Sequence, residues 1–419
     1  MESLSRHKHY KWIVLGLLFI TYFTLQGVRQ IYSASIPQIR SDFSALGVTA
    51  MSLGLVGTVF SFVYGLCAPC ASIIADIFRR RVMIILGCLL FSSGVFLAGF
   101  SHSLINLVLA YGVINALGQC MVPSSSSAVV SEYHENTRAT ALSIYQSALY
   151  IGTISASLFA GQIGAMGSGM WRWCFWGIGG FGMVWAVVLF FLLKEKRDTP
   201  SSVAAPVERP TFSEVLKAFF GTPAAIFLML AFGAMQYGDN GNRIWLTTFL
   251  TDNFSGLGPA KAAFHATFWY YIGAFVGIQI AGRLSDYFAA RTPRGRFLVS
   301  VGGLCMIIPG VLLSVRCDSF TLACVGMTVW GFGGGFYDAN LFAAIHDVVA
   351  PKFRASATGL FLGGGFLLGC CSPTVIGFIG DHFSMRTGMT TLSFFYAIAA
   401  VMLLIAMGCH ARRKLNENV

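Results

Sequence analysis

The chain has 419 residues, of which 56% are hydrophobic and only 11% are charged, and its formal net charge is +11. Soluble domains contain about 25% charged residues, so this composition excludes an ordinary soluble enzyme or binding domain. The apolar residues form long blocks separated by short polar stretches, which predicts an all-α, polytopic membrane protein. The basic residues lie mainly in the loops between blocks. We therefore interpret the positive net charge as a signal of membrane topology and expect no nucleic-acid partner.

Twelve apolar blocks follow one another, each long enough for one transmembrane helix. They lie near residues 12–38, 48–75, 82–100, 104–130, 139–165, 171–193, 214–250, 262–282, 297–315, 319–349, 355–380 and 389–410. The polar stretch 194–213 contains Pro200, Pro206 and Pro210 and predicts a cytoplasmic linker. We therefore expect an N-terminal six-helix bundle at 1–193, a pseudo-symmetric C-terminal six-helix bundle at 214–410 and a cytoplasmic tail at 411–419.

The loop charges predict the orientation of the chain. Most of the 28 lysines and arginines fall on one side of the membrane if both termini are cytoplasmic. The 11 cysteines lie mostly inside apolar blocks and show no disulfide or metal-ligand spacing. No phosphate-binding loop or catalytic motif is present, so we expect no cofactor, no metal and no enzyme activity. We predict a multi-pass protein of a bacterial inner (cell) membrane.

Two loops repeat between the halves of the sequence. One reads S72-I-I-A-D76-I-F-R79-R80-R81, and its counterpart reads G282-R-L-S-D286-Y-F-A-A-R291. Six spans plus six with repeated halves is the layout of one large class of secondary transporters. The first loop resembles the G-x-x-x-D-R-x-G-R-R signature of the major facilitator superfamily. It departs from that signature at Ser72, Ile77 and Arg79.

In that family the loop is a latch between helices, so the resemblance implies gating roles for both copies. The residues concerned are Asp76, Arg80 and Arg81 in the first copy and Gly282, Asp286 and Arg291 in the second. Ordinary interfacial charges are the alternative interpretation. The stretch around Arg29 resembles the organic-anion and organophosphate exchangers of the family, whereas the second block also resembles its spinster-type lipid carriers.

The first apolar block contains an arginine about 18 residues from its start. A guanidinium in hydrocarbon costs roughly 2.5–3.5 kcal/mol or more, and arginine does not lose its proton at ordinary pH. Tyr22, Gln26, Arg29 and Ser33 share one face of a helix by their spacing. We interpret this face as the lining of a cavity that binds an anion. The alternative is a buried arginine tied to backbone carbonyls or to one acid.

The seventh block contains Asp239 and Arg243, four residues apart, with Gly238 directly before Asp239 and Gly241 between the two. Arg243 is predicted either to be a second anion-binding arginine or to be neutralised by Asp239. In the tenth block, Asp338 is a second embedded acid. A carboxylate in low dielectric holds a proton more readily than in water, so Asp239 or Asp338 is the predicted proton carrier. A permanent salt bridge of Asp338 to an arginine is the alternative.

Other polar side chains within the blocks complete the predicted substrate site: Asn115, Gln119, Tyr145, Tyr150, Tyr270 and Asn340. We predict a secondary active transporter that moves a small organic anion by alternating access, with proton symport. The anion would be a sugar acid, a carboxylate or a sugar phosphate. Exchange against phosphate or another anion, and export of lipids or drugs, remain open. The expected partners are this anion, protons and the bilayer, and we expect a monomer.

Overall fold

The computed structural model describes residues 2–77, 79–134, 137–167, 169–194, 212–254, 256–292, 294–350 and 353–417. Within these ranges the regular structure is helical, as the long apolar blocks predict. The predicted linker at 194–213 falls almost entirely outside them, as do the last two residues of the predicted tail.

The helices before the linker are α1 (Glu2–Asp42), η1 (Ser44–Leu46), α2 (Ala50–Ile77), α3 (Arg80–Ala98), α4 (Leu104–Leu107), η2 (Val108–Asn115), α5 (Ala116–Tyr133), α6 (Arg138–Gly164) and α7 (Trp171–Leu192). The helices after it are α8 (Phe212–Phe220), α9 (Pro223–Asn253), α10 (Pro259–Ala289), α11 (Gly295–Arg316), α12 (Phe320–Asp338), α13 (Leu341–Val348), α14 (Arg354–Gly369), α15 (Ser372–His382) and α16 (Met385–Glu417).

The chain forms two compact units. The first contains Met1–Val48, Val59–Val207 and Gly256–Phe264, and the second contains Thr49–Thr58, Glu208–Ser255 and His265–Val419. Most of each unit is therefore one half of the sequence. Two short segments are assigned to the unit of the other half: the beginning of α2 and the beginning of α10.

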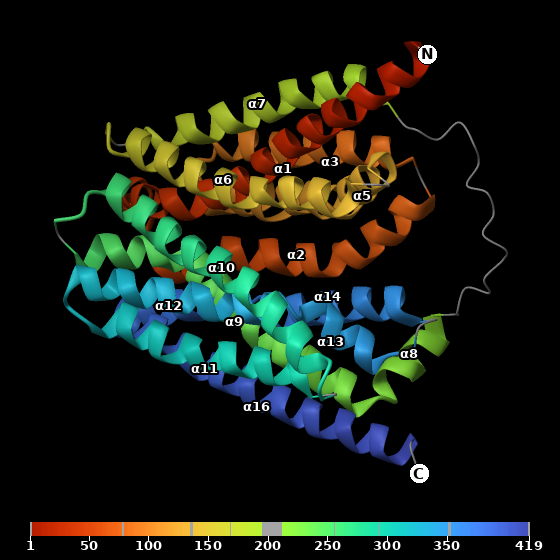
Figure 1. The fold of residues 1–419 in the computed structure, drawn as a ribbon. Helices are drawn as coiled ribbons and strands as arrows, with labels where there is room; N and C mark the ends of the chain where they lie inside the picture. The colour runs from red at the N-terminus through yellow and green to blue at the C-terminus, as the bar shows by residue number, and fades with distance from the viewer. Residues whose placement is uncertain are drawn as a thin grey trace. The chain divides into compact units, whose positions relative to one another are not determined.

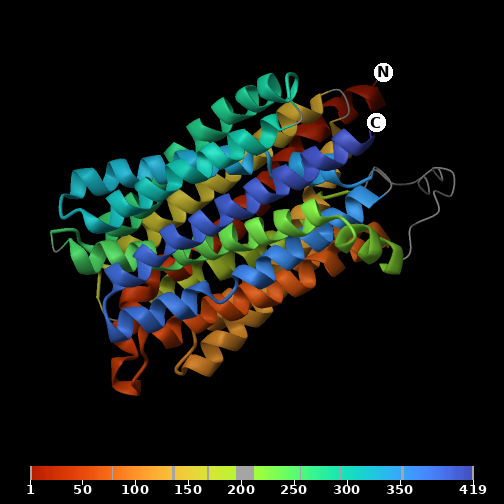
Figure 2. The same cartoon turned by 90° about the horizontal axis from the view of Figure 1, so that it is seen from below.

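Helix packing follows the same order in both units. In the first unit, α1 packs against α6 and α7, and α3 packs against α5 and α7 (Figure 1). In the second, α9 packs against α14 and α16, and α11 packs against α12 and α16. Figure 2 shows the blue α16 running beside the green α9. The repeated loop sequences thus belong to two bundles with corresponding helix contacts.

Eight helical stretches in the described ranges are long and apolar enough to cross a membrane. The number is nine if α8 and α9, which meet at 87°, form one broken span. Helices α6, α10 and α12 contain 27, 31 and 19 residues and so have spanning length as well. With these three, the helical stretches correspond to the twelve predicted spans.

Glycines allow the helices of each bundle to approach closely. At Gly118 of α5, an added Cβ would overlap the backbone nitrogen of Phe91 on α3. Membrane helices associate through such small residues because lipid provides no hydrophobic driving force between them. The close α3–α5 contact holds the neighbouring Gln119 fully buried inside the first unit.

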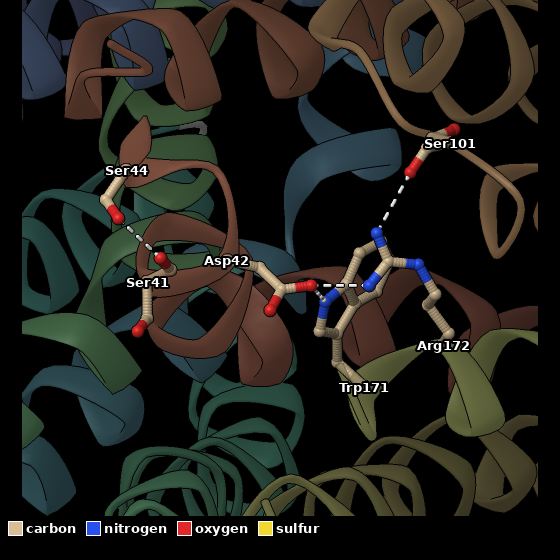
Figure 3. Close-up of polar contacts among 6 residues, drawn as sticks. All are labelled: Ser41, Asp42, Ser44, Ser101, Trp171 and Arg172. Atoms are coloured by element: carbon tan, nitrogen blue, oxygen red, sulfur yellow. Dashed lines mark hydrogen bonds and ion pairs between the residues drawn. The ribbon is translucent and has the colours of Figure 1, made fainter. Parts of the chain in front are cut away.

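A polar cluster joins three ends of the first unit (Figure 3). Asp42, the last residue of α1, accepts a hydrogen bond of 3.0 Å from Trp171 Nε1 and pairs with Arg172, both at the start of α7. Arg172 also donates to the carbonyl of Ser101, at 3.3 Å, and its guanidinium lies 4.5 Å from the Trp171 ring. Because both charged side chains are mostly buried, this cluster fixes the end of α1 against α7.

A carboxylate also holds the beginning of α2, within the second unit. Asp381 of α15 accepts hydrogen bonds from the backbone N–H groups of Ala50, at 2.9 Å, and Met51, at 2.8 Å. The first amides of a helix have no partner within the helix, and its N-terminus favours negative charge. Asp381 thus caps α2 from a distant part of the sequence.

Candidate functional site

Arg29 lies near the middle of α1 with its guanidinium between two aromatic rings. Its Cζ is 4.7 Å from the ring centre of Tyr64 and 5.5 Å from that of Phe60, both on α2. Its Nε donates to the side-chain oxygen of Gln119 on α5. Aromatic faces stabilise a cation that has been removed from water. The sequence pattern did not indicate these rings, because aromatic residues in an apolar block carry no signal of their own.

The outer edge of this guanidinium has no protein partner in the described part of the chain. Among those residues, the ion pairs do not include Arg29, and the Nε bond to Gln119 is the one hydrogen bond that its guanidinium makes. The side chain is half-buried. A cation held in this way keeps two N–H-bearing nitrogens available for an anion.

Gln119 is itself held by a chain of amides along η2 and α5. Its Nε2 donates to Asn115 Oδ1 at 2.8 Å, and Asn115 Nδ2 donates to the carbonyl of Tyr111 at 3.2 Å. Both amides are fully buried. We predicted Asn115 and Gln119 as substrate ligands, but the structure engages their side chains with each other and with Arg29. In this structure they position the guanidinium, and their contact with a substrate stays a prediction.

Tyr111 connects this amide chain back to α1. Its hydroxyl donates to the carbonyls of Arg29, at 3.1 Å, and Val28, at 3.3 Å. The contact lies on η2, an eight-residue π-helical segment within an otherwise α-helical stretch. Such segments occur frequently at functional sites. The backbone and the side chain of Arg29 are thus both fixed by the same part of the fourth predicted span.

The rest of the predicted polar face of α1 is largely buried in the bundle. Tyr22 stacks on Tyr145 of α6 with ring centres 4.6 Å apart, and both rings are buried. Gln26 is also buried, whereas Tyr150 of α6 is half-buried. The helical spacing predicted a shared face correctly, but along that face Arg29 is the residue that retains exposed polar surface.

A second polar cluster surrounds Asp239 on α9 in the second unit. Its Oδ1 accepts a hydrogen bond from Tyr396 of α16, at 3.2 Å, and from Tyr270 of α10, at 3.5 Å. Trp330 Nε1 of α12 donates in turn to the Tyr396 hydroxyl at 3.0 Å. At Gly238, an added Cβ would overlap the Tyr396 ring. This glycine therefore allows Tyr396 to lie directly on α9 and reach Asp239.

Arg243 and Asp338 belong to the same cluster. Arg243 is half-buried and acts electrostatically on both carboxylates. Asp338 is the last residue of α12, where the helix breaks before α13, and its side chain is exposed. Asn340 lies in the same break, but it is buried and donates to the carbonyl of Phe336 at 3.1 Å. The predicted clamp of Arg29 and Arg243 on one anion joins residues of two units and stays a prediction.

In the first predicted latch, both arginines contact residues outside the loop. Arg80 pairs with Glu132 at the end of α5, and Arg81 donates to the carbonyl of Phe190 on α7. The side chain of Asp76 lies outside the described part of the structure, so its pairing stays a prediction. An acid–base pair in the second unit corresponds to the first: Arg296, at the start of α11, pairs with Asp347 of α13 at 2.8 Å.

The predicted second latch is not formed in this structure. Arg291 stacks on the Tyr287 ring, with Cζ 3.6 Å from its centre. Asp286 is exposed and makes no ion pair with any residue in the described ranges. At Gly282 an added Cβ would meet open space, so packing does not require glycine there. Stacking on a neighbouring ring accounts for the position of Arg291 without a carboxylate.

Comparison with known proteins gives these clusters a family context. Residues 18–317 and 246–418 match the profile of the Major Facilitator Superfamily. The chain is 23% identical to a D-galactonate transporter of Escherichia coli O6:H1, over 95% of this chain and 96% of that protein. It is 24% identical to a hexuronate transporter of Bacillus subtilis over 90% of each. It is 23% identical to human protein spinster homolog 1, over 93% of this chain and 75% of that protein.

A solved structure has the same fold. It is a bacterial homolog of the human lysosomal transporter spinster, in an inward-facing, unoccupied conformation. Its TM-score to this chain is 0.83 at 20% sequence identity, and the match covers 96% of this chain and 98% of that one. The predicted fold class, an all-helical, multi-pass membrane protein, is confirmed. The profile match extends over most of the sequence, and the chain belongs to the Major Facilitator Superfamily.

Proposed function

We propose that the chain is a secondary transporter of small organic anions and that Arg29 binds the anion. The observation that carries the proposal is the guanidinium itself, which is held by Gln119 and two aromatic rings while its outer edge has no described partner. A planar guanidinium matches carboxylate and phosphate geometry with two parallel hydrogen bonds. A neutral or cationic substrate would gain nothing from such a group.

Sugar acids are the first candidates for the substrate. The relatives include transporters named for D-galactonate and for hexuronates, which are hydroxylated carboxylates. Tyr150 of the first unit is half-buried and adds a hydroxyl to the polar groups of that unit. A hydroxyl suits a ligand with many hydroxyl groups, because it can both donate and accept.

Proton symport is the mechanism we propose for driving uphill transport. Positive charge at Arg29 attracts the anion, and one proton taken up by a carboxylate of the second unit balances the anion's charge. The carrier then exposes its site to each side of the membrane in turn. The basic loops support cytoplasmic positions for both termini. A bacterial inner membrane and a monomer as the working unit are part of the proposal.

The test is uptake of labelled D-galactonate and D-glucuronate into proteoliposomes, with and without a pH gradient. We expect accumulation only when the side from which the anion enters is acidic. Uptake that is unchanged by acidification would exclude proton symport, and absence of binding for every anion in a wider panel would exclude the anion-carrier proposal. Arg316→Lys is a suitable control for substitution of Arg29, because Arg316 is an exposed arginine at the end of α11.

One alternative is an exporter of lipids, supported by the likeness to a sphingosine-1-phosphate transporter of Mus musculus, which is 23% identical over 85% of this chain and 68% of that protein. The same guanidinium edge could bind a lipid phosphate. Competition distinguishes the two proposals. If the chain is a sugar-acid carrier, D-galactonate inhibits transport at a much lower concentration than a lysophospholipid or a sphingoid phosphate does. The reverse order would favour the lipid exporter.

A further inference from the structure

The two embedded acids of the second unit have different surroundings. Asp239 is half-buried, and one of its oxygens accepts hydrogen bonds from Tyr396 and Tyr270. The Tyr396 hydroxyl is oriented by Trp330, whose indole N–H donates to it at 3.0 Å. Tyr396 and Trp330 are fully buried. Hydrogen bonds donated to a carboxylate favour its charged form, so this donor chain holds Asp239 as a fixed acceptor.

Asp338 has none of these donors. It ends α12 at the break before α13, its side chain is exposed, and it makes no hydrogen bond or ion pair with a residue in the described ranges. A break within a membrane helix is tolerated where it is buried in protein or lines a water-filled cavity, and the exposure of Asp338 favours the cavity. The side chain of Asp338 can therefore exchange protons with water, and no contact within the bundle has to be broken first.

The charges around Asp338 also come from several helices. Asp239 and Arg243 act on it from α9. The phenols of Tyr270 on α10, Tyr337 on α12 and Tyr396 on α16 are also within electrostatic range. A carboxylate that shares this space with Asp239 repels it when both are charged, and one arginine balances only one of them. One acid of the pair is thus favoured to carry a proton.

We propose a division of roles in which Asp338 carries the transported proton and Asp239 is the permanent counter-charge of Arg243. This assignment rests on the proposed symport. A proton from water binds an oxygen of the Asp338 carboxylate to give the neutral acid, and it returns to water on the other side of the membrane. Asp239 keeps its charge throughout, since two tyrosine hydroxyls and the electrostatic attraction of Arg243 all stabilise it.

The experiment compares Asp338→Asn with Asp239→Asn in proteoliposomes, using D-galactonate and D-glucuronate as probes. Two quantities are measured: accumulation driven by a pH gradient, and exchange of labelled for unlabelled anion without a gradient. We expect Asp338→Asn to lose accumulation and to keep exchange within about threefold of the wild type. We expect Asp239→Asn to lose both, because Arg243 is left without its fixed counter-charge. Asp338→Glu keeps an acid and should keep accumulation.

The assignment would be overturned if Asp338→Asn accumulates the anion, or if Asp239→Asn keeps exchange while Asp338→Asn loses it. It would also be overturned if both variants exchange the anion without accumulating it. A readout independent of transport separates this inference from the proposed function. If the wild type transports neither probe, the infrared band of a protonated carboxyl group is followed during a pH titration. Its loss in Asp338→Asn and its retention in Asp239→Asn would support the assignment, and the opposite result would overturn it.

Discussion

The position of Arg29 depends on Gln119, and Gln119→Leu tests this dependence. The substitution keeps the size of a side chain that is fully buried but removes the acceptor of the Arg29 Nε–H bond. Hydrogen bonds to charged groups contribute roughly 1.5–3 kcal/mol. In the variant, the anion must organise the guanidinium as it binds, so this free energy is subtracted from binding. Since 1.4 kcal/mol corresponds to tenfold, we expect affinity to fall about 10- to 100-fold.

The assay is equilibrium binding of labelled D-galactonate to purified protein, with thermal unfolding recorded to confirm that the variant is folded. Gln162→Leu makes the same chemical change at an exposed position of α6 and should bind like the wild type. Gln119→Glu keeps an acceptor beside Arg29 but adds a negative charge, so it should also lose anion affinity. Wild-type affinity in a folded Gln119→Leu variant would refute the positioning role.

Three further predictions concern stability and the second cluster. Asp42→Ala removes the acceptor of Trp171 and the ion-pair partner of Arg172 and should destabilise the protein by about 3 kcal/mol, seen as a lower melting temperature in detergent; an unchanged value would contradict this. Gly238→Ala should displace the Tyr396 ring, cost about 1–3 kcal/mol and reduce pH-driven uptake. Removing the cap of α2 by Asp381→Ala should cost about 1–2 kcal/mol, with fast hydrogen exchange confined to the first turn of α2; global loss of protection would count against a local cap.

The apolar blocks predicted most of the fold, because membrane helices must be long, apolar and internally hydrogen-bonded. The repeated loops indicated two related halves, and their helices do pack in the same order. The sequence did not show that the starts of α2 and α10 pack with the unit of the other half. The placement of these two segments depends on tertiary contacts. One of them is the Asp381 cap, which joins residues 331 positions apart.

The candidate site was predicted only in part. The cost of a charge in hydrocarbon identifies Arg29, Asp239 and Asp338 from the sequence. That rule does not say which polar groups hold other side chains, so the contact of Gln119 with Arg29 is visible only in the structure. Tyr396 and Trp330 were missed, because an aromatic residue in an apolar block reveals its polar atom only once its neighbours are known.

We propose that the guanidinium of Arg29 binds the anion through the two nitrogens of its outer edge. The most direct test is the affinity of Arg29→Lys for D-galactonate and D-glucuronate, measured beside Arg316→Lys as the matched control. Lysine keeps the charge but loses the planar fork. We predict at least a tenfold loss of affinity in Arg29→Lys, with the wild-type value in the control. Wild-type affinity in both variants would contradict it.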